Sequence, residues 1–369
     1  MTRSLLLTLV VFLSVPVFCG DALPYRTDGG NEKLPWYQVK LGEFPPEGSA
    51  HRISGEVIEI DHIRRTAVLR PDRNDSQRTD DYDKPMPFTM LPYGHLKFHG
   101  SYAEVRDIPI GTHMHGLFYV DEKPRPDGKG PFTKCILLED DFSHAESQKR
   151  TWRIDAVQID KRLLTVTGVG ADGKADAKAT NFVLHPATRI WKGRAIGELK
   201  DLAAGQNVLI NLTVCTLKGP GRAVDIWIDE ESRNVAAAQQ LEIHRLYQRE
   251  HGLACWVDEV DNKEGLVTVT VFDGVDPALL KEMPVKSSIA AAVAEDSLRT
   301  YDQINDTQRG PITDIKSVPV VPGCSGVRIT FKPQNLVEGF RPRRFLRIFA
   351  GGWRVDDLPR EEGVYFGKP

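Results

Sequence analysis

The feature that most constrains the fold of this 369-residue chain is an internal repeat. Three segments open with a β-rich run that ends at an aspartate: Gly55–Asp61, Ile154–Asp160 and Cys255–Asp261. After a few polar residues each has a second β-rich run: Thr66–Leu69, Leu164–Thr167 and Leu266–Val271. Two such runs around a polar turn predict a β-hairpin, and the aspartate is expected to cap the turn by accepting backbone N–H groups. The repeat therefore predicts three successive β-modules.

The first two segments continue to match without a gap. Their shared core is Glu104–Ile108 followed by Gly111, against Glu198–Leu202 followed by Gly205. This pattern predicts a short helical turn and a glycine with positive φ. We then expect strands at His113–Val120 and Cys135–Leu138 in the first segment, and at Asn207–Val214 and Ala223–Ile228 in the second. Five strands with one helical turn suit a small closed barrel, which leaves no sheet edge exposed.

The third segment is less regular. The helix formers in residues 231–252 predict a linking helix that ends at Gly252. Residues around 276–314 are expected to form an insertion, with a short helix near Ile289–Leu298. Pro322–Ser325 predicts the turn of a hairpin, and Leu336–Phe340 a degenerate copy of the helical turn.

The predicted fold class is therefore mainly β, with three consecutive small OB-like β-barrels and a helical linker before the third. The expected organisation is a signal peptide (1–22), an N-terminal extension (23–50), barrel 1 (51–145), barrel 2 (146–230), the linking helix (231–252) and barrel 3 (253–369).

The runs Phe182–Thr188 and Leu199–Val208 are similar to those of exported bacterial small-barrel modules, including the periplasmic copper-chaperone barrel family with its OB-like fold. The resemblance covers part of the second segment and, more faintly, the first. In that family a histidine, a tryptophan and a Met-x-Met pair hold copper. Here Met86 falls in that pair, but Lys84 takes the other position. The resemblance thus implies the fold, whereas the family's metal ligands are not retained.

The N-terminus predicts export. Arg3 precedes an apolar run from Leu5 to Cys19, which is shorter than the roughly 20 residues of a membrane-spanning helix. This is typical of a cleaved signal peptide, with cleavage expected after Ala22. No transmembrane segment is expected in the mature chain. We therefore expect a periplasmic or extracellular protein.

The composition bears on partners and cysteine pairing. The net charge of −3 gives no electrostatic field that would attract nucleic acid, so no nucleic-acid partner is expected. The mature cysteines, Cys135, Cys215, Cys255 and Cys324, could pair in an oxidising compartment or remain buried thiols. The sequence leaves this choice, and any pairing, open.

Histidine is unevenly distributed, with six of the ten between residues 51 and 115. His113 and His115 flank Met114 on a predicted strand, so both imidazoles should lie on one face and Met114 on the other. His95 and His99 lie on the connection that leads to that strand. Imidazole binds zinc and copper, so these four histidines form a candidate metal site, with copper or zinc as the cofactor. The alternative is a polar barrel face with satisfied histidines.

Other chemical signals are weaker. Arg341, Arg343 and Arg344 form a candidate anion site, because guanidinium groups bind carboxylate or phosphate. We find no nucleophile, zincin or phosphate-loop motif, and acidic pairs such as Asp140–Asp141 have no position that indicates catalysis. No catalytic residue is therefore predicted.

Three functions follow from these patterns. The first is an exported, non-catalytic binding or scaffold protein with a protein or glycan partner. The second is a periplasmic copper- or zinc-binding protein that uses the histidines of barrel 1. The third is an extracytoplasmic hydrolase, whose catalytic carboxylates a single sequence does not reveal.

Overall fold

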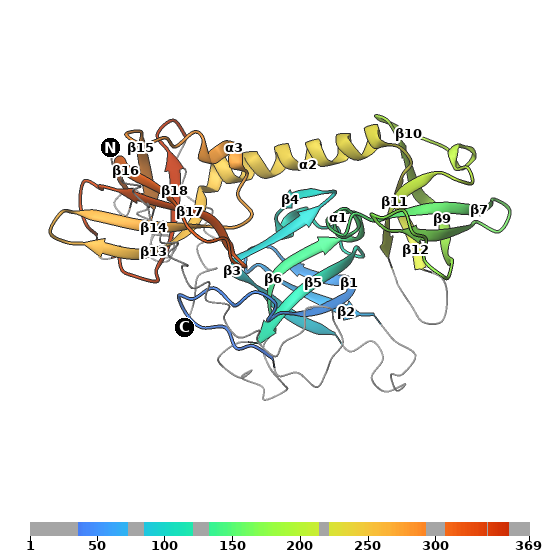
Figure 1. The fold of residues 1–369 in the computed structure, drawn as a ribbon, viewed down its shortest axis with the longest axis horizontal. Helices are drawn as coiled ribbons and strands as arrows, with labels where there is room; N and C mark the ends of the chain where they lie inside the picture. Colours follow the sequence, from blue (N-terminus) through green and yellow to red (C-terminus); the bar gives the residue numbers. More distant parts are fainter. Residues whose placement is uncertain are drawn as a thin grey trace, which may run out of the picture.

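The computed structural model describes residues 36–72, 85–120, 133–213, 221–292, 307–337 and 339–353. It confirms a mainly β chain with three closed barrels in sequence and one long helix between the second and the third. Figure 1 shows barrel 1 in the centre, with barrels 2 and 3 on either side of it. The predicted signal peptide, Cys215 and the C-terminal residues 354–369 lie outside the described residues.

Barrels 1 and 2 have the same strand order. Barrel 1 consists of β1 (His51–Asp61), β2 (Thr66–Pro71), β3 (Met86–Phe98), β4 (Ser101–Ala103), β5 (His113–Val120) and β6 (Thr133–Asp140). Barrel 2 consists of β7 (Thr151–Gln158), β8 (Leu163–Val169), β9 (Thr180–Lys192), β10 (Ala195–Ile196), β11 (Asn207–Thr213) and β12 (Gly221–Trp227). In both, the third strand pairs antiparallel with the second and parallel with the last, which closes the barrel. Apart from the short strands β4 and β10, which add to β3 and β9, each barrel has the five-stranded Greek-key arrangement expected of an OB-like barrel.

Barrel 3 closes in another way. Its strands are β13 (Leu253–Asp261), β14 (Leu266–Phe272), β15 (Ser288–Ala292), β16 (Thr307–Ser317), β17 (Cys324–Phe331) and β18 (Phe345–Ala350), and all their pairings are antiparallel. The prediction of a helix near Ile289–Leu298 is wrong for residues 289–292, the part that the structure describes. Ser288–Ala292 is instead a strand that pairs with β16 and β18. The segment expected as an insertion thus supplies barrel strands, and its described part also contains the short helix α3 (Pro277–Leu280).

The repeat recurs at the level of single hydrogen bonds. The first strand of every barrel has a register shift just after Val57, Ile154 or Val257. The carbonyl of each of these residues accepts a backbone N–H, from Gly111, Gly205 and Arg343 respectively. All three donors have positive φ, at 94°, 89° and 72°. The two glycines confirm the prediction, and barrel 3 uses an arginine at the same structural position.

Each of barrels 1 and 2 is followed by a helix with an aspartate N-cap. Asp140 caps α1 (Asp141–Ser147) by accepting from the Ser143 N–H at 2.9 Å. Asp229 caps α2 (Glu230–His251) by accepting from the Ser232 N–H at 2.7 Å. The α2 helix ends at Gly252, as predicted. No helix in the described parts of the chain is both long and apolar enough to cross a membrane.

Helix α1 fills the junction between barrels 1 and 2. Phe142 is fully buried and packs with Leu209 and Trp227 of barrel 2. The Asn211 side chain accepts from the Phe142 N–H at 2.8 Å and donates to Asp140 at 2.7 Å. Because buried polar groups need such partners, these bonds fix how the two barrels meet.

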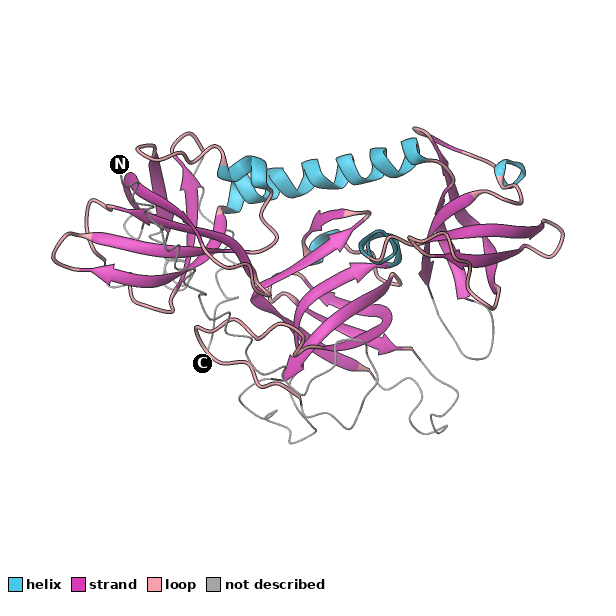
Figure 2. Ribbon diagram, viewed as in Figure 1, coloured by secondary structure: helices cyan, strands magenta, loops and turns pink. Residues whose placement is uncertain are grey.

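Helix α2 runs from barrel 2 to barrel 3 and passes over barrel 1 (Figure 2). Its buried side chains are polar: Ser232, Gln240, His244, Gln248 and His251. Gln240 donates to the Tyr102 carbonyl of barrel 1 at 3.3 Å, and Gln248 donates to the Gly274 carbonyl of barrel 3 at 3.0 Å. The helix is therefore held to both barrels by directional hydrogen bonds, and its position along them is fixed.

An aromatic cluster joins barrels 1 and 3 directly. Tyr93 of β3 packs edge-on against Trp256 and Phe272 of barrel 3, with ring centroids 5.7 and 5.9 Å apart. Phe44 from the N-terminal extension lies against both sides, 5.3 Å from Tyr93 and 4.2 Å from Trp256. Such rings bury a large apolar area in a defined geometry. The extension is thus part of the interface.

Candidate functional site

Two histidines of one strand and one aspartate converge beside the junction of barrels 1 and 2. His113 and His115 lie on the outer face of β5, and Met114 between them is fully buried in the barrel core, as predicted. Asp141 is the first residue of α1. One oxygen of Asp141, Oδ1, lies 2.7 Å from His113 Nδ1 and 3.0 Å from His115 Nε2. Strand alternation places the imidazoles, and the capped helix brings the carboxylate to them.

The remaining polar atoms of these three side chains are also occupied. His113 Nε2 lies 2.9 Å from Asp72 Oδ2, and His115 Nδ1 lies 2.7 Å from Ser54 Oγ. Asp141 Oδ2 accepts from the Leu212 N–H of barrel 2 at 2.9 Å. Every ring and the carboxylate are therefore fixed in orientation.

Burial and charge set the protonation of the cluster. Burial lowers the pKa of His115, and the hydrogen bond and charge of Asp141 oppose this shift only in part. Burial by itself would raise the pKa of Asp141, but the charge of His113 and the hydrogen bonds from both imidazoles lower it well below its ordinary value. The Asp141 carboxylate is thus ionised at neutral pH and is available as an acceptor or a ligand.

A second layer surrounds the cluster. The His144 ring stacks on His115 with centroids 4.0 Å apart. His144 Nδ1 lies 3.3 Å from Glu139 Oε2 and 3.2 Å from an Arg52 nitrogen. The hydrogen bond of His144 and the charge of Lys97 outweigh burial and lower the pKa of Glu139.

The other two predicted ligands lie elsewhere. His99 stacks on Phe98 and packs edge-on against Trp227 at 5.0 Å. Its backbone N–H donates to Asp140 at 3.0 Å, so it belongs to the junction next to the cluster. His95 points toward barrel 3, where its Nδ1 lies 3.6 Å from Asp273. The structure thus brings His113 and His115 together, while His95 and His99 contact other residues.

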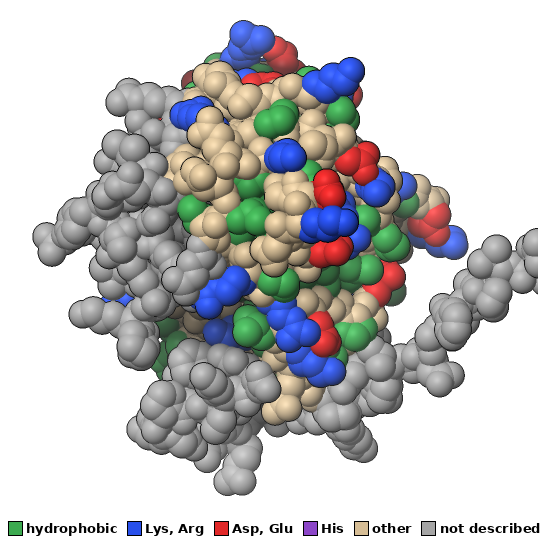
Figure 3. Space-filling view, turned by 90° about the vertical axis from the view of Figure 1, so that its left-hand side faces the viewer, with side chains coloured by type: hydrophobic (Ala, Val, Ile, Leu, Met, Phe, Trp, Pro, Cys, Tyr) green, Lys and Arg blue, Asp and Glu red, His purple; other side chains and the backbone are tan. Residues whose placement is uncertain are grey.

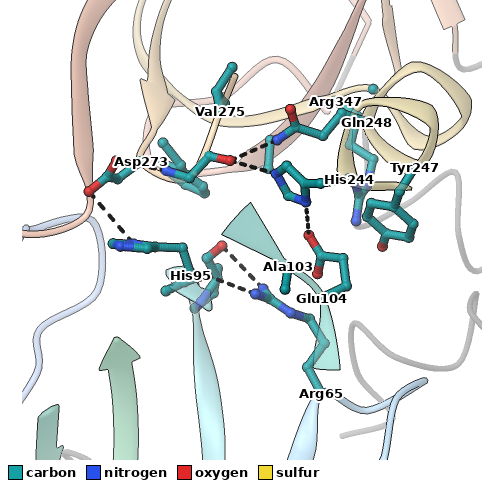
Figure 4. A pocket seen from close by; sticks show the side chains of 16 residues that line it. Arg65, His95, Ala103, Glu104, His244, Tyr247, Gln248, Asp273, Val275 and Arg347 are labelled. Carbon is teal, nitrogen blue, oxygen red and sulfur yellow. Dashed lines mark hydrogen bonds and ion pairs between the residues drawn. The ribbon is translucent and has the colours of Figure 1, made fainter. Parts of the chain in front are cut away.

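His95 lines a small cavity of about 60 Å³ between barrel 1, α2 and barrel 3. Figure 4 shows two histidine–carboxylate pairs there, His95 with Asp273 and His244 with Glu104, the latter 3.8 Å apart. His244 Nε2 also lies 2.7 Å from the Gly274 carbonyl. Burial lowers the pKa of His95 more than the charge of Asp273 raises it. The volume suits a few waters rather than an organic ligand.

The predicted anion site lies at the entry to β18. Arg341 and Arg343 are exposed, and Arg344 is half-buried. The backbone of Arg343 and Arg344 brackets Val257, with the Arg344 carbonyl accepting its N–H at 2.9 Å. This run is the third barrel's form of the turn that contains Gly111 in barrel 1. Anion binding by its side chains stays a prediction.

Sequence reasoning missed Asp72, Ser54 and Asp141 as partners of the histidines. Asp141 belongs to an acidic pair that is visible in the sequence, but its position depends on the fold. The three described cysteines, Cys135, Cys255 and Cys324, are buried free thiols, while Cys215 lies outside the described residues.

No family model, no curated protein and no solved structure matches this chain.

Proposed function

We propose that this protein is an exported, non-catalytic scaffold whose three barrels, held in one arrangement, bind a protein or glycan partner. The observation that carries the proposal is α2, which joins barrel 2 to barrel 3 and is hydrogen-bonded to barrel 1 on the way. The aromatic cluster and the α1 junction connect the same three bodies. A chain that bound through one barrel alone would not need these contacts.

The surface chemistry supports a macromolecular partner. On the face at the barrel 3 end, basic and acidic side chains are interspersed with apolar ones (Figure 3). Mixed surfaces of this kind suit protein or glycan contacts better than a polyanion, which favours a continuous basic surface. Export is supported by the charge and apolar run of residues 1–22.

The test couples partner binding to the fixed arrangement. The mature full-length chain, with a photo-crosslinker on barrel 3, is incubated with cell-envelope extract, beside a Gln240→Ala/Gln248→Ala variant that loses contacts of α2 to barrels 1 and 3. We expect the variant to stay folded, to show a broader interbarrel distance distribution in solution scattering, and to lose the crosslinked partner. Gln239→Ala on the exposed face of α2 is the matched control.

Equal capture by the loosened variant would contradict the scaffold role, because one barrel would then suffice. Turnover of a glycan or peptide by the purified chain would contradict the non-catalytic part. Export has its own test, since mass spectrometry of envelope protein should find the N-terminus of the mature form at or near Leu23 rather than at Met1.

A further inference from the structure

We propose that His113, His115 and Asp141 form a binding site for a divalent first-row transition metal, and Zn²⁺ is the ion with which the site is tested. His113 Nδ1, His115 Nε2 and an Asp141 carboxylate oxygen offer three ligand atoms, and the candidate ligand atoms lie within 4.8 Å of one another. Two imidazoles and one carboxylate are a common zinc donor set in sites that keep one coordination position open. The inference is independent of the scaffold role and adds a ligand that the fold alone does not imply.

The second contacts of the three side chains make this more than a chance cluster. In metal sites the ligating histidine donates its other ring N–H to a carboxylate or a similar acceptor, which fixes its tautomer and orientation. His113 has Asp72 in this role at 2.9 Å, and His115 has Ser54 at 2.7 Å. Asp141 uses its second oxygen for the Leu212 N–H. Each ligand therefore presents its remaining donor atom to the shared centre.

The two contacts of Asp141 need only a small adjustment to accept the ion. Donor atoms bonded to zinc at 2.0–2.1 Å in a tetrahedral site lie about 3.4 Å apart. Here Asp141 Oδ1 is 2.7 Å from His113 Nδ1 and 3.0 Å from His115 Nε2, because hydrogen bonds take the place of the metal. An opening of several tenths of an ångström, with release of the shared protons, replaces those bonds by metal bonds.

The donor set also selects the class of metal. Nitrogen and oxygen donors suit Zn²⁺ and other borderline divalent ions, whereas Cu(I) prefers sulfur. The Met114 side chain is fully buried on the opposite face of β5 and contributes no thioether. His144 stacks on His115, and its Nδ1 contacts Glu139 and Arg52. The fourth position is therefore left for water, for the other ring nitrogen of His144 or for a donor from a partner.

Barrel 2 provides an internal control for this site. Its strand β11 corresponds to β5, yet Asn207 and Leu209 stand at the positions of His113 and His115. The barrel fold therefore does not require imidazoles at these positions. Because Asp141 also holds the Leu212 backbone of barrel 2, a bound ion would tie the two barrels together.

The experiment measures zinc content and affinity on the mature full-length chain by mass spectrometry of metals and by titration against a chelating dye. We expect one tightly bound Zn²⁺ per wild-type chain and a rise in melting temperature with zinc. His113→Ala/His115→Ala should lose the stoichiometric ion, whereas His62→Ala, at an exposed histidine of the same barrel, should keep it. Asp72→Asn should weaken affinity 10- to 100-fold without removing a ligand.

A wild-type chain that binds no zinc, or binding that is unchanged in the double variant, would overturn the proposal. Should the double variant misfold, the visible absorption spectrum of the wild-type chain loaded with Co²⁺ tests the proposal instead. The strong visible absorption of four-coordinate cobalt, reduced in intensity or shifted in Asp72→Asn, supports the site. The weak spectrum of aqueous cobalt refutes it.

Discussion

Barrels 1 and 2 share strand order, strand register shift and a capped helix at their C-terminal end, but they use that helix differently. His99 and Gly193 occupy the same position, with φ of 51° and 55°, and their N–H groups donate to the cap aspartates Asp140 and Asp229. After Asp140 the helix is short and enclosed between two barrels. After Asp229 it is a 22-residue rod with one face in solvent.

The difference shows how a repeated structural device acquires different roles. The residue two positions after the cap is Phe142 in α1, fully buried, and Glu231 in α2, which is exposed. The residue directly after the cap is Asp141, which meets two imidazoles, or Glu230, which faces solvent. The two repeats share the cap because it closes the barrel end, while the next residues depend on what packs there.

The largest expected effect is at the enclosed helix. Phe142→Ala should lower the free energy of unfolding by about 3–5 kcal/mol, because a fully buried ring is lost between Leu209 and Trp227. Glu231→Ala, at the matching position of α2, should change it by less than about 0.5 kcal/mol. Urea unfolding of both variants measures the contrast. Similar losses would contradict the view that only α1 is a packed junction.

The caps should differ by a smaller amount. Asp229→Ala removes a helix cap and should cost about 1 kcal/mol. Asp140→Ala should cost about 2–3 kcal/mol, since it also leaves the buried Asn211 amide without its acceptor, whereas the bond from His99 N–H or Gly193 N–H is lost in both variants. Thermal unfolding ranks the two variants. Asp229→Asn should retain most of the cap, because asparagine caps helices as well as aspartate does.

The smallest expected effect is on the pH dependence of the melting temperature, and it distinguishes aligned positions of β3 and β9. In β9 the aligned residue is Arg189, which pairs with Asp225 at 2.7 Å. His95 instead faces Asp273, Lys97, Glu139 and His244, and burial lowers its pKa.

A histidine whose pKa is lowered by folding binds a proton more readily in the unfolded state, where its pKa is about 6.5. The folded protein is therefore most stable above this pH, and stability is lost as the pH falls below it. The melting temperature of the wild type should therefore drop more between pH 7.5 and 5.5 than that of His95→Gln. Arg189→Gln should keep the wild-type dependence. If the melting temperature of His95→Gln depended on pH as strongly as that of the wild type, protonation of His95 would not be the cause of the pH dependence.

Much of the fold could be predicted because its signals are local. The hairpins, the glycine turns and the linking helix depend on residues near one another in the chain, and barrels 1 and 2 follow from them. Barrel 3 was harder, since its strand β15 and most of β16 lie in the segment 276–314, which was expected to be an insertion. Its turn uses Arg343 at the position where the repeat has glycine.

The candidate site was predicted in part for a similar reason. Strand alternation alone places His113 and His115 on one face and Met114 on the other, so the sequence determined that pair. Asp141 and Asp72 reach the pair only after the barrel has closed and α1 has docked. His95 and His99 are close to the pair in sequence, but the path of β3 and the following turn directs one to barrel 3 and the other to barrel 2. The alternation of side chains along a strand follows from the local sequence alone. The convergence of side chains that are distant in the sequence depends on packing, so only the tertiary structure decides which of them meet.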